Sequence, residues 1–330
     1  MWRVKSLDAI LATAEKKSLH RSLGPVQLTL LGIGAIIGTG IFVLTASAAQ
    51  KAGPGMMISF VIAGAVCAVA ALCYSELAAM APVSGSAYTY TYAVMGELLA
   101  WTVGWALILE YAVAASAVSV GWSGYVLGLI EQGLGFDFPD LLSAGPTWSM
   151  NGFIPTPDFS AGVVNIPAIV VALLVTALLM VGTTESARVN AVLVAIKVVA
   201  LTVFIIITLP AIKSANLSPF APNGLFGQYS GMGVVGAAAS IFFAYVGFDA
   251  VSTAAEETKN PQRNVPIGLI GSLAICTVFY LLVALGAAGA IGAQPVLGAA
   301  GEAVQPGSPA FVAACALPAN ADRLVCSNEA

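Results

Sequence analysis

Two glycine-containing stretches place backbone groups where they could bind a small charged molecule. The stretch 32–42 reads Gly-Ile-Gly-Ala-Ile-Ile-Gly-Thr-Gly-Ile-Phe, and the stretch 240–249 reads Ser-Ile-Phe-Phe-Ala-Tyr-Val-Gly-Phe-Asp. Glycine weakens a helix and allows close approach of a ligand to the backbone. Amides at the N-terminus of a half-helix suit a carboxylate, and carbonyls at the C-terminus of a half-helix suit an ammonium. Two broken, antiparallel helices would therefore suit a zwitterion.

The glycines of the first stretch also have a purely structural interpretation. Gly34 and Gly38 form a Gly-x-x-x-Gly pair, and small residues at this spacing often serve close helix packing in membranes. Packing and ligand binding both stay open for this stretch. A dinucleotide fingerprint is excluded, because the third glycine comes one residue late and no strand precedes it.

Three ionisable residues fall inside long apolar stretches: Glu110, Lys197 and Asp249. Charges at membrane depth are costly and usually functional. We expect Glu110 to face an internal cavity. Lys197 lies about two helical turns from the end of its stretch and could instead extend its amine to the interface. For Asp249, accepting hydrogen bonds that hold the broken stretch is preferred over direct ligand contact.

The composition requires a solvent other than water around most of the fold. The chain has 330 residues, of which 59% are hydrophobic and 8% charged, whereas a soluble domain has about 25% charged residues. The net charge of −4 provides no basic face for nucleic acid. With a single histidine, His20, and with Cys67 and Cys73 six residues apart in an apolar stretch, which is not a metal-ligand spacing, we predict no metal site and no cofactor.

Apolar stretches of about 20 residues predict membrane-spanning helices. Seven are found, and the third is interpreted as one long tilted helix. The predicted fold class is therefore all-α, a multi-pass transmembrane helix bundle. The predicted spans are 26–49, 55–79, 97–130, 163–183, 190–212, 231–254 and 266–292.

The distribution of Lys and Arg predicts the orientation of these spans. With the N-terminus in the cytoplasm, eight basic residues lie inside and three, Lys51, Lys213 and Arg323, lie outside. We therefore predict a cytoplasmic segment 1–25, a transmembrane core 26–292 and an extracytoplasmic tail 293–330, in the cell (inner) membrane. The tail carries Cys315 and Cys326, which outside the cytoplasm could form a disulfide or remain free thiols.

Three blocks of sequence, in order, resemble the amino acid–polyamine–organocation superfamily. The first is the glycine stretch 32–42. The second is Tyr74-Ser-Glu-Leu followed by Pro82, Gly85-Ser86 and Tyr88, and the third is Phe243-Ala-Tyr-Val-Gly-Phe-Asp with Glu256-Glu-Thr-Lys-Asn-Pro-Gln-Arg-Asn-Val-Pro. The third block is similar to the cationic amino acid transporter branch. The resemblance implies a LeuT-like fold of two inverted five-helix repeats, of which this chain holds the N-terminal portion, truncated after about seven spans.

The resemblance also implies roles for particular residues. The unwound first helix would bind the substrate carboxylate, and carbonyls of the sixth helix would bind its amino group. Phe248 would lie over the substrate as a gate, and Glu110 would lie near the side-chain pocket. Lys197 would take the place of a bound sodium ion, which favours proton coupling or exchange over sodium symport. The implied first-helix residues are Ile36, Gly38, Thr39 and Gly40, and the sixth-helix residues are Phe243, Ala244 and Val246.

The predicted function is thus that of an amino acid permease, a secondary active transporter in the lipid bilayer and not an enzyme. A seven-helix receptor or light-sensing protein is disfavoured by the cytoplasmic N-terminus and by the lack of lysine in 266–292. A membrane-embedded enzyme is disfavoured because the spans contain no histidine. A non-transporting fragment or assembly subunit stays as the alternative. Cationic and neutral substrates, the coupling ion, the direction of transport and the oligomeric state stay open.

Overall fold

The chain folds almost entirely into helices, as the all-α prediction requires. Of the predicted terminal segments, 1–25 is described only from residue 21, and 293–330 only in part. His20 lies outside the described residues. The computed structural model describes residues 21–136, 138–151, 154–159, 162–181, 183–227, 232–298, 313–320 and 326.

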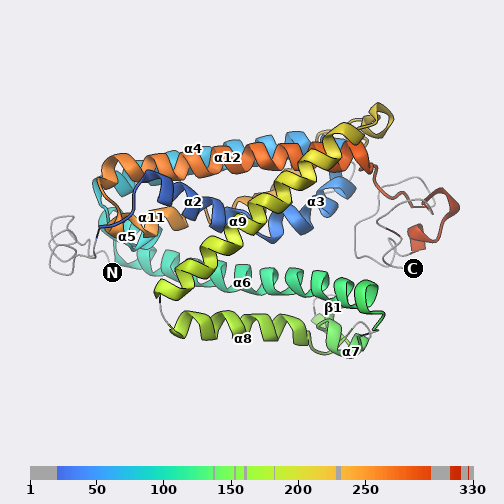
Figure 1. Ribbon diagram of the computed structural model, residues 1–330, viewed down its shortest axis with the longest axis horizontal. Helices are drawn as coiled ribbons and strands as arrows, with labels where there is room; N and C mark the ends of the chain where they lie inside the picture. The colour runs from blue at the N-terminus through green and yellow to red at the C-terminus, as the bar shows by residue number, and fades with distance from the viewer. Residues whose placement is uncertain are drawn as a thin grey trace. The chain divides into compact units, whose positions relative to one another are not determined.

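Long helices follow the predicted spans in order (Figure 1). The first and sixth predicted spans are each divided into two helices, and the third is one continuous helix. The helices are α2 (Pro25–Ile36), α3 (Thr39–Ala52), α4 (Met56–Met80), α6 (Glu97–Leu134), α8 (Ile166–Val181), α9 (Thr183–Thr208), α10 (Gly233–Ile241), α11 (Ala250–Thr253) and α12 (Pro261–Ala290).

Length and composition mark several of these segments as able to cross a membrane. The described residues contain five such helical segments, one of which joins α3 and α4 through the 3₁₀ turn η1 (Gly53–Gly55). Two shorter apolar helices, Pro25–Ile36 and Ile166–Met180, accompany them. The five are Thr39–Met80, Glu97–Leu134, Val189–Ala211, Gly233–Thr253 and Pro261–Ala290.

The remaining elements are short. The helix α5 (Ser86–Val94) connects the second and third spans. The segment between the third and fourth predicted spans holds α7 (Asp140–Ser143) and one antiparallel hairpin, β1 (Thr147–Asn151) paired with β2 (Ile154–Asp158). The other 3₁₀ turns are η2 (Leu209–Ala211), η3 (Ser214–Leu217), η4 (Phe242–Tyr245), η5 (Ala255–Glu257) and η6 (Pro318–Asn320).

The fifth helix begins earlier than its predicted span. We predict a span from residue 190, but α9 already begins at Thr183, two residues after α8 ends at Val181. The difference arises because hydropathy detects only the part of a helix that suits lipid. The mostly polar residues 183–188 interrupt the apolar pattern without preventing helix formation.

The chain forms two compact units, Met1–Trp101 with Val192–Ala330, and Thr102–Ala191. In the first unit α12 packs along α4 (Figure 1) and along α2. Helix α10 packs against α3 and α4. The largest side chains at the centre are fully buried rings, those of Phe60, Tyr245 and Tyr280. The broken spans therefore lie in the packed interior of this unit.

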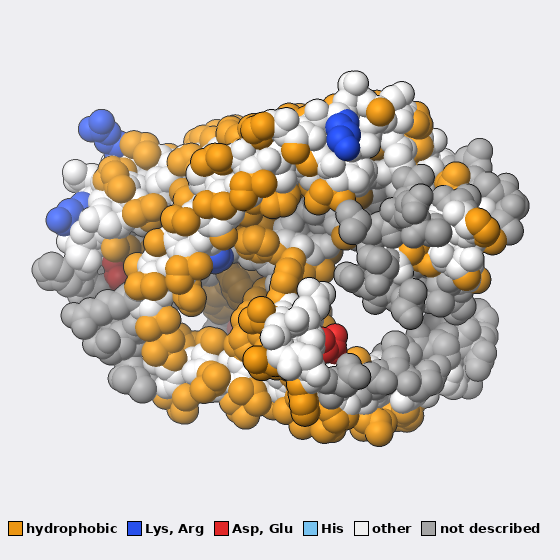
Figure 2. Space-filling model, turned by 45° about the vertical axis from the view of Figure 1, so that its right-hand side comes forward, with side chains coloured by type: hydrophobic (Ala, Val, Ile, Leu, Met, Phe, Trp, Pro, Cys, Tyr) orange, Lys and Arg blue, Asp and Glu red, His pale blue; other side chains and the backbone are white. Residues whose placement is uncertain are grey.

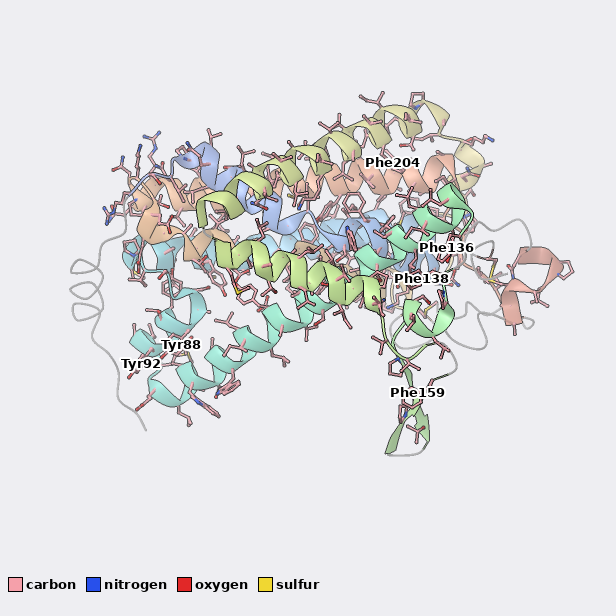
Figure 3. The ribbon with its side chains drawn as sticks, turned by 60° about the horizontal axis from the view of Figure 1, so that its bottom comes forward. Tyr88, Tyr92, Phe136, Phe138, Phe159 and Phe204 are labelled. Atoms are coloured by element: carbon pink, nitrogen blue, oxygen red, sulfur yellow. A yellow bond between two sulfur atoms is a disulfide. The ribbon has the colours of Figure 1, made fainter. Side chains whose placement is uncertain are left out.

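Helix α9 contacts α12 within the first unit through a small residue. A Cβ at Gly286 would lie 2.2 Å from the Thr208 hydroxyl oxygen and 3.7 Å from a ring carbon of Phe204. Figure 3 labels Phe204 on α9 beside α12. Glycine at this position lets the two helices approach closely, as small residues do in membrane bundles.

In the second unit a polar contact joins α6 to the start of α8. The Asn165 side-chain amide donates to the Ser123 hydroxyl at 2.8 Å, and its carbonyl oxygen accepts from the Ala168 amide at 2.9 Å. The same asparagine thus caps α8 and ties it to α6. Hydrogen bonds between spans satisfy polar groups where water is absent.

The surface is apolar over large areas. Figure 2 shows hydrophobic side chains across most of the described part of the face in view. Outward-facing positions of α4 and α9 carry Val69 and Ile206, each about two-thirds exposed (64% and 65%). Soluble monomers rarely expose such continuous apolar surface, so a bilayer is the solvent this surface suits.

Candidate functional site

The first predicted span is broken between α2 and α3, where its glycines cluster. α2 ends at Ile36 and α3 begins at Thr39, and both residues between them are extended. Ile37 has φ −72° and ψ 98°, and Gly38 has φ −141° and ψ −153°. Extended residues interrupt the helical hydrogen-bond ladder, so the last carbonyls of α2 and the first amides of α3 require other partners.

The sixth predicted span is broken as well. α10 ends at Ile241, the turn η4 follows, and α11 begins only at Ala250. Within the break Gly247 has φ +106°, a conformation that favours glycine. A Cβ there would also lie 2.8 Å from the Ala35 carbonyl oxygen. Backbone conformation and the close approach of the first span both require glycine at this position.

The two breaks meet in the packed interior of the first unit. A Cβ on Gly40 would lie 2.3 Å from the Cα of Ala244. Backbone therefore contacts backbone at this point. Close packing against Ala244 therefore requires glycine at position 40, and its role in substrate binding stays a prediction.

Side chains satisfy the carbonyls at the end of α2. The Lys197 ammonium donates to the carbonyl oxygens of Gly34 at 2.9 Å and Ile37 at 2.6 Å. The Tyr280 hydroxyl lies 2.9 Å from both the Ile36 and the Ala244 carbonyl oxygens and donates to one of them at a time. Lys197 thus points to the broken first span, so the alternative in which its amine reaches the membrane interface is wrong.

The first amides of α3, unlike the last carbonyls of α2, have no side-chain partner among the described residues. Within the described residues no side chain caps this helix, and the amides of Gly38, Thr39 and Gly40 donate no hydrogen bond. A Cβ on Gly38 would meet no described atom within 4 Å. Neither packing nor its extended backbone requires glycine there. Open space beside unpaired amides at a helix N-terminus is the arrangement that suits an anionic group.

The three sixth-span carbonyls that are predicted to bind the amino group differ in their hydrogen-bond partners. The Phe243 carbonyl accepts from the Val246 amide at 3.2 Å, and the Ala244 carbonyl can accept from Tyr280. Within the described chain no donor is recorded for the Val246 carbonyl. A carbonyl has two lone pairs, so all three retain the capacity to bind an ammonium.

Phe248, the predicted gate, is 8% exposed and lies within the break, next to Gly247. Its ring lies 5.9 Å from that of Tyr74 on α4, edge to face. Asp249 is buried, and its backbone carbonyl accepts from the Ser252 amide at 2.8 Å. Glu110 lies on α6 in the other compact unit, so its assignment to the substrate pocket stays a prediction.

One residue at the breaks escaped the sequence analysis. Tyr280 of α12 is fully buried and reaches both broken spans. It belongs to a cluster of rings, with centroids 5.2 Å from Tyr245 and 5.7 Å from Phe60. The available signal was a tyrosine in the middle of an apolar span, because a hydroxyl at that depth needs a hydrogen-bond partner.

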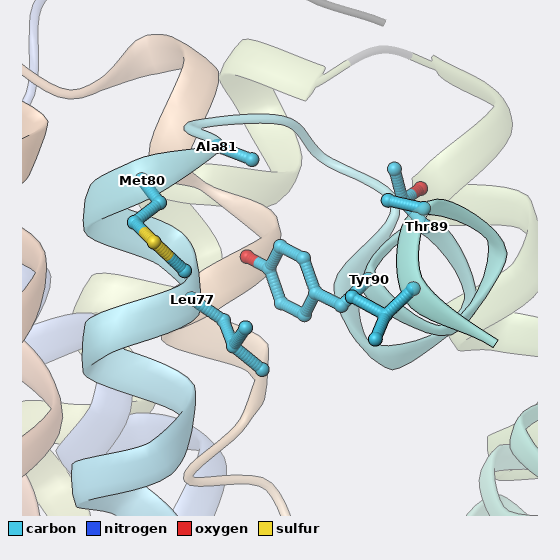
Figure 4. A pocket seen from close by; sticks show the side chains of 7 residues that line it. Leu77, Met80, Ala81, Thr89 and Tyr90 are labelled. Carbon is cyan, nitrogen blue, oxygen red and sulfur yellow. The ribbon is translucent and has the colours of Figure 1, made fainter. Parts of the chain in front are cut away.

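A small pocket lies apart from the two breaks. It has a volume of about 140 Å³ and lies between the last turn of α4, at Leu77 and Met80, and α5, at Thr89 and Tyr90 (Figure 4). The Tyr90 hydroxyl is buried and has no hydrogen-bond partner in the described part of the chain. Burial, and to a smaller extent Tyr74, raises the pKa of Tyr90 to about 12. None of the predicted substrate residues lines this pocket.

Comparison with known proteins identifies the class to which this fold and site belong. A sequence model of the amino acid permease family matches residues 23–314. The chain therefore belongs to the amino acid permease family.

The relatives with similar sequences are named as permeases or transporters. The chain is 50% identical over 284 residues to the branched-chain amino acid permease BcaP of Bacillus subtilis, and 47% identical over 286 residues to the methylthioribose transporter of the same organism. It is 44% identical over 271 residues to the chloroplastic cationic amino acid transporter 9 of Arabidopsis thaliana.

The alignments cover most of this chain but only part of each relative. They include 86%, 86% and 81% of this chain, and 58%, 58% and 45% of the respective relatives. The chain thus spans little more than half the length of the bacterial relatives, as expected of an N-terminal portion. Both bacterial and plant relatives fit the predicted superfamily.

Proposed function

We propose that the chain is the N-terminal part of a secondary active transporter that carries amino acids across the cell (inner) membrane. The observation that carries the proposal is the pair of breaks. Among the described residues, the amides beside the open space at Gly38 and the carbonyl of Val246 have no hydrogen-bond partner. A zwitterion needs both kinds of group, and the permease relatives support this substrate class.

Lys197 supports a coupling mechanism without sodium. Its ammonium donates hydrogen bonds to the carbonyl oxygens of Gly34 and Ile37. Such oxygens are the ligands that a bound metal cation would otherwise use. Cations at the C-terminus of a helix interact favourably with its dipole. We therefore propose proton coupling or exchange, with Lys197 as the coupling residue.

The proposed orientation has the N-terminus in the cytoplasm. The count of Lys and Arg favours it, and the disulfide between Cys315 and Cys326 in the tail is compatible with it. Disulfides persist in extracytoplasmic compartments and are rare in the cytosol.

A second candidate substrate is methylthioribose, favoured by one relative that is nearly as similar as the first. This molecule is a neutral thioether sugar, so it would use the unpaired amides only as hydrogen-bond donors. It would not require the charge complementarity of the two half-helices. The two candidates therefore differ in how strongly they depend on the break at Gly38.

The test is uptake by this chain reconstituted in liposomes under an imposed pH gradient. Radiolabelled leucine, alanine, arginine and methylthioribose would each be supplied with and without sodium. Saturable, sodium-independent uptake of an amino acid supports the proposal, and uptake of methylthioribose alone favours the second candidate. Correctly inserted protein without uptake or binding supports the alternative, a chain that does not transport by itself.

A further inference from the structure

We infer that Glu256 is a positioning residue that fastens α5 to the second half of the broken sixth span and keeps this end of the substrate path closed. The inference rests on the proposed function and deepens it, because it concerns how the same site is opened and closed. Neither the glycine breaks nor Lys197 belongs to this contact. It lies where the chain enters α2, enters α5 and leaves α11.

The contact itself joins residues that are far apart in the sequence. The Glu256 carboxylate accepts from the backbone amide of Ser84 at 2.9 Å and lies 3.3 Å from the Ser84 hydroxyl. Ser84 directly precedes the turn into α5, whereas Glu256 lies in η5 beyond α11. Charge-assisted hydrogen bonds to an amide are about twice as strong as neutral ones.

A second contact supports the first. The Ser252 hydroxyl of α11 lies 3.3 Å from the Ser86 hydroxyl and 2.6 Å from the Asp249 carbonyl oxygen, and donates to one of them at a time. Ser86 and Ser252 are both buried. The chain at the start of α5 therefore contacts the other segment at two points, Ser86 with Ser252 of α11 and Ser84 with Glu256 of η5.

The backbone at this junction is strained. Ser86 and Asn260 both have φ +47°, and they are the two non-glycine residues with positive φ in the described chain. Each flanks the contact, Ser86 on the α5 side and Asn260 on the α12 side. Strained residues of this kind persist where surrounding contacts over-determine them, and they often mark clamps and switches.

The same segment also holds the entry to α2. The amides of Ser22 and Leu23 donate to the Glu257 carbonyl at 2.9 and 3.0 Å, and the Lys259 amide donates to the Leu23 carbonyl at 2.9 Å. One side of η5 thus binds the chain before α2, and Glu256 binds the chain before α5. Two segments, the chain before α2 and the chain before α5, are thus tied to one short turn after α11.

Ring contacts connect this junction to the predicted gate. Tyr74 lies 5.9 Å from Phe248 and 6.5 Å from Tyr90 of α5, measured between ring centroids. Movement of α5 away from α11 would therefore remove packing from Tyr74 and from the gate. In transporters, gating movements of one helix bundle against another control access to the site.

The first measurement is hydrogen–deuterium exchange at the Ser84 amide in the full 330-residue chain in lipid nanodiscs. Glu256→Ala removes the acceptor and should speed exchange about tenfold or more. Glu256→Gln should have a smaller effect, because its amide oxygen can still accept. The matched control is Glu257→Ala, an exposed neighbour whose contacts here are made by its backbone. It should leave exchange within about twofold of the parent.

The second measurement reports whether the interior of the protein becomes accessible to a reagent when the contact between Glu256 and Ser84 is removed. Cys276 of α12 is fully buried, so its alkylation by a maleimide, resolved by peptide mass spectrometry from that of exposed Cys73, reports access to the interior. Glu256→Ala should speed labelling of Cys276 severalfold, and Glu257→Ala should not. Faster exchange at Ser84 with unchanged labelling of Cys276 would overturn the inference, as would unchanged exchange in both Glu256 variants.

Neither readout needs a substrate. A chain that transports nothing but shows both effects supports the role of Glu256 while contradicting the proposed transport. Normal uptake with neither effect contradicts the role of Glu256 alone. If Glu256→Ala fails to fold, Glu256→Gln gives the same comparison with a milder change.

Discussion

The ammonium of Lys197 lies 2.6 Å from the carbonyl oxygen of Ile37, the first extended residue after α2. A second carbonyl, that of Gly34, lies 2.9 Å from the same nitrogen. A positive charge is thereby fixed at the C-terminal end of a half-helix, one step along the chain from the unpaired amides at Gly38. The lysine and the open amides thus occupy the two sides of one break.

Replacing Lys197 should change the pH dependence of transport. Lys197→Ala removes the charge that neutralises the end of α2 and leaves two carbonyls without this donor. We expect uptake driven by a pH gradient to be lost and the remaining exchange activity to vary little with external pH. The measurement is initial uptake rate between pH 5 and 8, with exposed Lys213→Ala as control. An unchanged pH profile in Lys197→Ala would remove this residue from the coupling mechanism.

Substitutions at two glycines of the first break should have different effects, one on substrate binding and the other on folding. Gly38→Val places a side chain in open space, so the protein should insert and fold while binding of amino acids is abolished. Gly40→Val instead meets the Cα of Ala244 at a distance no real contact allows, so the folded yield should collapse. Equilibrium binding and the thermal midpoint of each purified variant test this contrast. Retained binding by folded Gly38→Val would refute the first-helix site.

The positions of the breaks could be predicted from sequence because they are local. Glycines among bulky apolar residues weaken a helix wherever it packs, so the interruption at Gly38 and the turn at Gly247 were both within predicted stretches. The length of α6 followed equally from a continuous apolar run. These features depend on neighbours along the chain, which the sequence displays directly.

The partners of the broken ends could not be predicted, because they come from distant segments. The sequence around Lys197 does not show whether its amine reaches the membrane interface or the carbonyl of Ile37. Tyr280 looks like any tyrosine in a span until α12 is packed along α2. The contact between Glu256 and Ser84 likewise appears only once the two loops are brought together.

Removing the hydroxyl of Tyr280 should weaken the link between the two broken spans. Tyr280→Phe leaves the buried ring in place but removes the donor shared by the Ile36 and Ala244 carbonyls. We expect a loss of about 1–3 kcal/mol of stability, the cost of leaving a buried group unsatisfied, together with weaker amino acid binding. Chemical denaturation and equilibrium binding measure the two effects. Tyr88→Phe on α5, at a side chain that is 41% exposed (Figure 3), should be neutral, and an equal effect of both variants would contradict the linking role.

The tail should be accessible only from the side opposite the N-terminus, and only after reduction. Cys315 and Cys326 are joined by a disulfide, with Cα atoms 5.2 Å apart, so neither thiol reacts in the oxidised protein. In intact cells a membrane-impermeant maleimide should label both cysteines after treatment with an impermeant reductant, and neither before it. A Cys315→Ser variant should expose the single thiol of Cys326 without reduction, which confirms the pairing. Labelling confined to inside-out vesicles would reverse the proposed orientation, because the tail would then share the compartment of the N-terminus.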